Sequence, residues 1–144
     1  MLWMGVSTIF MQFFNTIRNG IKYIKEFDDA LVELQKVTEF TSNTYKEMQM
    51  SAISLGKELG KSSVDIMRSY AEFGRVTKIK EEIESLAESA ILASNVTSMS
   101  AESAAKSINT TMIAFKMNAK DSIKIIDQWN ELKTSISGSL YSNV

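Results

Sequence analysis

The chain has 144 residues, which is enough for one domain or for a piece of a longer protein. It has 16 basic and 17 acidic residues, a net charge of −1, and no His, Cys or Pro. The missing residue types exclude disulfides, thiolate nucleophiles, Cys/His metal sites and catalytic relays through His, and the near-zero net charge argues against a dedicated nucleic-acid-binding protein. An apolar fraction of 44% is too high for a disordered chain.

The N-terminal segment, residues 1–17, carries no charge, and the first cation, Arg18, follows it. A secretory signal would place Lys or Arg before the apolar stretch. A membrane span needs about 20 apolar residues, whereas this stretch is shorter and is interrupted by polar residues such as Gln12 and Asn15. We therefore expect an apolar helix start that packs on a partner, with insertion of the same segment in lipid as the alternative.

Apolar residues between positions 10 and 34 recur at steps of three and four, with a mean step of about 3.5 residues. This period is typical of coiled coils and helical bundles, and it predicts one amphipathic helix over residues 3–38, about 54 Å long. Because such a helix is longer than those that follow, part of it needs other copies of the chain, and a parallel bundle is the arrangement we favour. The candidate self-association residues are Phe10, Phe14, Ile17, Ile21, Ile24 and Leu31.

A polar stretch, residues 38–44, separates this helix from the next. Thr44 and Glu47 fit a capping box, in which each side chain satisfies a free N–H group at the helix start. The second helix is therefore expected to begin there and to end at Leu59, with Gly60 in the left-handed conformation that terminates many helices.

Four shorter helices follow, each with apolar residues three or four positions apart. The third is expected to begin at Ser62 or Ser63 and to end at Gly74, and Ser100 is expected to cap the fifth. Replacing Phe115 with Ala is expected to cost about 3–5 kcal/mol of stability. The predicted core residues are Met67, Tyr70 and Phe73, then Ile79, Ile83, Leu86 and Ala90, then Ala101, Ala105, Ile108, Met112 and Phe115, and finally Ile123, Ile126, Trp129 and Leu132.

These elements predict an all-α fold: a long N-terminal amphipathic helix followed by a compact bundle of about five short helices. We divide the chain into residues 1–38, the long coiled-coil-like helix; residues 39–135, the helical bundle; and residues 136–144, a polar tail that is cut off before another helix. The chain is interpreted as a fragment.

Motifs with chemical meaning are weak. Ser54–Lys57 and Ser103–Lys106 match the Ser-x-x-Lys spacing of some hydrolases, but pairs at this spacing are expected by chance and the rest of that signature is missing. A carboxylate cluster suggests a metal site, but without a Glu-x-x-His segment it is better interpreted as a solvated face; its members are Glu81, Glu82, Glu84 and Glu88. We therefore predict no enzyme activity and no catalytic, cofactor-binding or metal-binding residue.

A set of short helical strings between residues 27 and 133 is more specific in its order and spacing than any one string alone. The strings are Phe27–Leu31 with Leu34–Thr38, Ala52–Glu58, Ser63–Asp65, Ala71–Gly74, Leu92–Thr97 with Ser100–Glu102, Ala114–Met117 with Ala119–Asp121, and Ile125–Glu131. Taken together, they resemble the conserved core region of phage tail tape measure proteins. The apolar segment before Phe27 is similar to the helix that often precedes this core in the family.

The resemblance implies a structural component of a phage or prophage tail, part of a longer protein that sets tail length during assembly and leaves ahead of the DNA on infection. It implies as partners copies of the chain itself in a low-order oligomer such as a trimer, tail tube and tail tip proteins, and tail assembly chaperones, with transient contact with the host membrane and no direct sequence-specific binding of nucleic acid. The implied location is the lumen of the virion tail, and the host bacterial cytoplasm during assembly. The alternative is a membrane-active or secreted helical protein that inserts its N-terminal segment in lipid.

Overall fold

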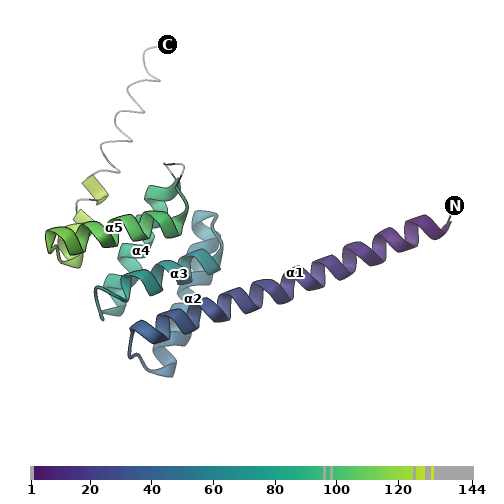
Figure 1. The fold of residues 1–144 in the computed structure, drawn as a ribbon, viewed down its shortest axis with the longest axis horizontal. Coiled ribbons are helices and arrows are strands. Elements are labelled where there is room, and N and C mark those ends of the chain that lie inside the picture. The colour runs from purple at the N-terminus through teal and green to yellow at the C-terminus, as the bar shows by residue number, and fades with distance from the viewer. Residues whose placement is uncertain (1, 96, 98, 125, 129–130, 132–144) are drawn as a thin grey trace, which may run out of the picture.

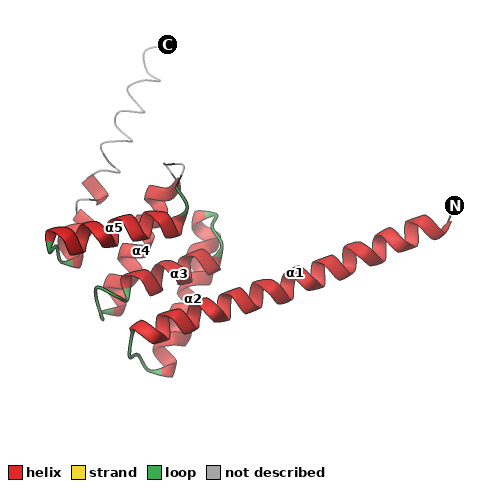
Figure 2. Ribbon diagram, in the orientation of Figure 1, coloured by secondary structure: helices red, strands yellow, loops and turns green. Residues whose placement is uncertain are grey.

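The computed structural model describes residues 2–95, 97, 99–124, 126–128 and 131. Its labelled helices are α1 (Leu2–Val37), α2 (Ser42–Leu59), α3 (Ser63–Phe73), α4 (Lys80–Asn95) and α5 (Ala101–Phe115), and residues 119–124 are also helical. Within the described residues there is no strand, and short loops join the helices (Figure 2). The predicted architecture, a long first helix followed by a compact all-α bundle, is confirmed.

Helix α1 has two parts with different surroundings. Its C-terminal part packs on the bundle through Phe27, Ala30, Leu31 and Leu34, chiefly against α3. The rest of the helix projects away from the bundle as a straight arm (Figure 1), and every described side chain from residue 11 to residue 25 is exposed. We call residues 2–25 the arm.

Helix α3 is the centre of the bundle, because it contacts α1, α2, α4 and α5. Asp65, Arg68 and Glu72 form its single polar stripe, at helical spacing, and these three side chains are partly exposed. The remaining residues of the helix are buried: Ser63, Val64, Ile66, Met67, Ser69, Tyr70, Ala71 and Phe73. A short helix with so narrow a polar face is stable only when other helices surround it.

Side-chain hydroxyls cap the starts of three helices, and the predicted start of one of them is wrong. The Ser62 hydroxyl caps α3, which decides between the two predicted starts, and the Ser100 hydroxyl caps α5 as predicted. The predicted capping box of Thr44 and Glu47 is wrong, because the N-cap of α2 is Thr41, whose hydroxyl accepts a hydrogen bond from the Thr44 N–H at 3.2 Å. Helix α2 therefore begins about one turn earlier than predicted.

Two glycines end helices for different reasons. Gly60 follows α2 with φ of 66°, the left-handed conformation predicted for it. Gly74 follows α3 with φ of −58°, so the need for glycine there is one of space. A Cβ at Gly74 would lie 2.9 Å from Cγ2 of Thr38 and 3.0 Å from Cγ2 of Val37. The end of α1 thus rests directly on the backbone that follows α3.

In the C-terminal part of the bundle, two residues predicted to lie in the core are exposed. Helices α4 and α5 contact each other, and many of their buried side chains are small, among them Ala87, Ala90 and Ala105. Phe115 is 74% exposed and Ile79 is also exposed, so the predicted core positions of both, and the large cost of replacing Phe115, are wrong. The predicted core positions of Trp129 and Leu132, and the tail over residues 136–144, lie outside the described residues.

Candidate self-association site

The arm carries an apolar stripe that the bundle leaves uncovered. The exposed fractions are 58% for Phe14, 44% for Ile17, 64% for Ile21 and 69% for Ile24. These residues follow one another at steps of three and four, so on a helix their side chains lie along one face. Single exposed apolar residues are ordinary on a protein surface, whereas several that share one face make that face a candidate interaction surface.

The two ends of the predicted site differ from its middle. Leu31 packs against the core of its own bundle, so this candidate lies at the point where α1 docks on the rest of the chain. Phe10 lies within α1, but its side chain is outside the described part of the structure. The structure therefore places Phe14, Ile17, Ile21 and Ile24 together on the exposed face of the arm.

Cations lie along one flank of this stripe. Arg18, Lys22 and Lys25 are its charged residues, and no acidic residue occurs in the sequence before Glu26. At helical spacing the three cations share one side of the helix. Lys22 pairs with Glu26 at an N–O distance of 3.7 Å, an exposed contact of little energetic weight. No helix among the described residues is long and apolar enough to cross a membrane.

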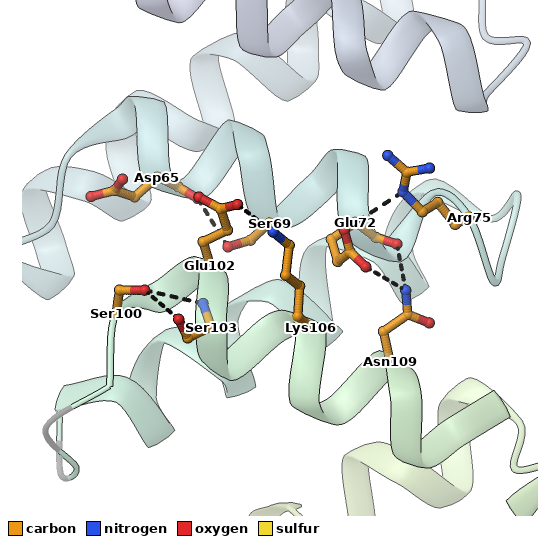
Figure 3. Close-up of polar contacts among 9 residues, drawn as sticks. All are labelled: Asp65, Ser69, Glu72, Arg75, Ser100, Glu102, Ser103, Lys106 and Asn109. Atoms are coloured by element: carbon orange, nitrogen blue, oxygen red, sulfur yellow. Dashed lines mark hydrogen bonds and ion pairs between the residues drawn. The ribbon is translucent and has the colours of Figure 1, made fainter. Parts of the chain in front are cut away.

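A second surface feature lies where α1, α3 and α5 meet. It is a polar groove of about 570 Å³, lined by Glu33, Lys36, Val37, Arg68, Ala71, Glu72, Arg75, Glu102 and Lys106. In Figure 3 the side chains of α3 and α5 approach one another along this groove. Lys106 donates to Glu102 at 2.7 Å, and this hydrogen bond raises the pKa of Lys106 and lowers that of Glu102. Three acidic and four basic side chains line the groove, so no single ligand charge is favoured there.

Asn109 is the polar residue that sequence reasoning missed. Its amide donates to the backbone carbonyl of Glu72 at 3.1 Å and to the carboxylate of Glu72 at 2.8 Å, and thereby fastens α5 to α3 (Figure 3). Arg75 lies on the other oxygen of that carboxylate at 3.6 Å. The signal in the sequence was an Asn placed between Ala105 and Met112 on the apolar face of a helix.

Two hydrogen bonds lie at the start of α4, and one of them involves a member of its acidic cluster. Glu82 accepts a hydrogen bond from the Thr77 hydroxyl at 2.6 Å. Lys80, at the start of α4, donates to Glu47 of α2 at 2.7 Å, which raises the pKa of Lys80. Among the described residues, no group of three acidic, His or Cys side chains is arranged to hold a metal ion.

No protein-family model matches the chain, and no solved structure matches it at a significant level.

Proposed function

We propose that the chain is a structural component of a phage or prophage tail, a piece of a tape measure protein that helps to set tail length and is released ahead of the DNA. The observation that carries this proposal is the arm: a long helix that projects from a compact bundle with an uncovered apolar stripe. A helix has a fixed rise of about 1.5 Å per residue, so a protein that works by length is well served by it.

The chemistry of the described residues is consistent with action by shape. Side chains in the groove between α1, α3 and α5 pair with one another, as Lys106 does with Glu102 and Arg75 with Glu72. In this proposal the partners are other copies of the chain, tail tube and tail tip proteins, and tail assembly chaperones. The site of action is the lumen of the tail, after assembly in the host cytoplasm.

The test is made in the host that carries the gene. We expect peptides of this chain in purified tails by mass spectrometry, and we expect deletion of the gene to abolish tails or to make their lengths variable by electron microscopy. Particles that lack these peptides, together with tails of unchanged length after deletion, would show the proposal to be wrong.

A second candidate function is binding to a lipid surface through the arm. The specific observation that favours it is the combination of exposed Phe13 and Phe14 with the cations Arg18, Lys22 and Lys25. We expect the full chain to float with anionic liposomes if this function is correct, and binding to fall when residues 1–17 are removed. Unchanged liposome binding after that removal would refute this candidate.

A further inference from the structure

We infer that the groove between α1, α3 and α5 binds a carboxylate group presented by an acidic segment of a partner protein, with the guanidinium of Arg68 as its anchor. The inference goes beyond the proposed function and does not depend on it, because it uses only side chains of the bundle. Three observations carry it: which charges of the groove are already paired, where Arg68 lies among them, and how polar the lining is.

Most charges of the groove are engaged by other groups of the chain. Oε1 of Glu72 accepts from the Asn109 amide at 2.8 Å, and Oε2 of Glu72 lies 3.6 Å from Nε of Arg75. Glu102 accepts from the ammonium of Lys106 at 2.7 Å (Figure 3). Although the lining as a whole favours no ligand charge, these contacts pair two of its acidic and two of its basic side chains with each other.

Arg68 is a cation of α3 that these pairs leave over. On a helix its nearest partners would be Asp65, three residues earlier, and Glu72, four residues later. Arg68 forms no ion pair or hydrogen bond with any described residue, and the carboxylate of Glu72 is held by Asn109 and Arg75 instead. A partly buried guanidinium with five N–H donors therefore lines the groove without an acceptor from the described part of the chain.

Helix α1 contributes the two other charges that are left over. They are the exposed side chains of Glu33 and Lys36, which line the same groove as Arg68. The three together carry a net charge of one positive unit, from two cations and one carboxylate. This excess fits a ligand with one anionic group, for which Lys36 is a second donor.

The acidic side chains around Arg68 select a carboxylate over a phosphate. The hydrogen bond from Lys106 has the largest effect in lowering the pKa of Glu102, and the charge of Arg68 lowers it further, so Arg68 and Glu102 face each other across the groove. A phosphate group with nearly two negative charges would be repelled by Glu102 and Glu33. A carboxylate carries one charge, and its two oxygens match the planar fork of an Arg side chain.

The lining favours a protein segment over a free small acid. The volume of about 570 Å³ lies within the range of ligand sites, about 300–1,000 Å³. Small-molecule sites are lined mostly by apolar side chains, whereas Val37 and Ala71 are the only apolar residues among those that line this groove in the described structure. An acidic segment of another protein gains further contacts outside the groove and does not need an apolar pocket.

The first experiment titrates the isotope-labelled full chain with a peptide and follows its backbone amide signals by NMR, at an ionic strength of about 0.15 M. The probe is a capped alanine peptide that carries two glutamates, and its control carries two glutamines. We expect saturable shifts at Arg68, Ala71 and Lys106 with the glutamate peptide alone. No saturable shift up to about 10 mM peptide, or equal shifts with the glutamine peptide, would overturn the inference.

The second experiment removes the anchor. Arg68→Gln should weaken binding of the glutamate peptide by about 10-fold or more, and Arg68→Lys, which keeps the charge but loses the fork, should restore only part of the affinity. Lys57→Gln is the matched control, because it removes one positive charge from the exposed surface of α2, outside the groove. Circular dichroism checks that each variant folds. Equal losses in Arg68→Gln and Lys57→Gln would overturn the inference.

A third variant predicts the opposite sign. Glu102→Gln removes a carboxylate that faces Arg68 and releases Lys106 from its ion pair, so it should tighten binding of the glutamate peptide about two- to fivefold. A loss of affinity, or no change, would place the bound carboxylate away from Arg68 and overturn the inference.

Two further probes identify the source of the anion. Succinate that binds as tightly as the glutamate peptide would overturn the partner segment, and inorganic phosphate that binds more tightly would overturn the carboxylate. We expect both to bind more weakly than the peptide. Tail lengths after deletion of the gene test the proposed function alone, so failure of that function and failure of this inference are distinguishable.

Discussion

Tyr70 shows how a single side chain joins three helices of the bundle. Its ring is fully buried in the core, and its hydroxyl lies 3.1 Å from the hydroxyl of Ser51 on α2. Burial raises the pKa of Tyr70 from 10.0 to about 12, against the lowering effect of the Ser51 hydrogen bond, and the charges of Glu84 and Glu88 on α4 raise it further. The neutral phenol is therefore the form that the folded state retains.

This shift predicts a stability effect at high pH. The folded-state pKa is above the unfolded value, so the contribution of Tyr70 is complete below pH 10 and is lost as the pH rises towards 12, in total by about 2–3 kcal/mol. Tyr70→Phe loses one hydrogen bond, at a cost of about 1 kcal/mol near neutral pH, but has no proton to lose. We expect urea unfolding to show the variant less stable at pH 8 and more stable than the native chain near pH 12.

Tyr23→Phe is the matched control for that comparison. Tyr23 lies on the exposed arm and is no part of the core, so its replacement removes a phenol without removing a core contact. A stability difference between Tyr70→Phe and the native chain that is the same at pH 8 and pH 12 would contradict the prediction.

At the scale of the helices, Gly20 and Gly56 have opposite surroundings. A Cβ at Gly20 meets no heavy atom within 4 Å, because the arm is open on that side. A Cβ at Gly56 would lie 2.9 Å from the carbonyl oxygen of Lys61 and 3.0 Å from the hydroxyl oxygen of Ser63. The loop that joins α2 to α3 folds back on Gly56, and the N–H of Lys61 donates to the Gly56 carbonyl at 2.9 Å.

These surroundings predict opposite signs for one substitution. Gly20→Ala should stabilise the arm helix by up to about 1 kcal/mol, seen as slower amide exchange between residues 16 and 24. Gly56→Ala should destabilise the bundle by about 1–3 kcal/mol, because a backbone oxygen gives way less easily than a side chain, seen as a lower urea midpoint. Each variant is the control for the other, and a shift of the same sign in both would contradict the prediction.

The helices can be predicted from the sequence because apolar periodicity and N-caps depend on residues close together in the chain. Helix boundaries and buried positions are predicted wrongly where contacts between distant residues determine them. Thr41 and Thr44 both suit an N-cap, and the choice follows from Tyr45, whose hydroxyl accepts from the Phe40 N–H and donates to the Thr38 carbonyl. Phe115 continues the apolar spacing of α5, but it is the last residue of the helix, and at Lys116 the chain turns with φ of 50°. The Phe115 side chain is left 74% exposed at that end of α5.

The candidate self-association site could likewise be predicted only in part from the sequence. The heptad spacing indicates the stripe from Phe14 to Ile24, and the structure leaves it exposed. Leu31 continues the spacing but contacts its own core, because the bundle lies against the C-terminal part of α1. The position along α1 at which the bundle begins depends on where α3 packs, which no local pattern encodes.

At the scale of the whole molecule, α1 belongs to two units that meet near Glu26. The described side chains of the arm up to Lys25 are all exposed, whereas Phe27, Ala30 and Leu34 contribute to the core of the bundle. Stability of the bundle and association of the arm should therefore be separable, since few contacts are shared between them.

Removing the arm tests this separation directly. A chain that begins at Lys25 should unfold cooperatively within about 2 °C of the full chain when both are compared as monomers, because it keeps every described core residue. A chain that begins at Gln35 lacks Ala30 and Leu34, which are almost fully buried, and should lose cooperative unfolding because α3 is left uncovered on the α1 side. Thermal circular dichroism measures the first effect, and sedimentation shows whether association goes with the arm. If the chain beginning at Lys25 also loses its cooperative transition, the arm stabilises the bundle and the two units are one.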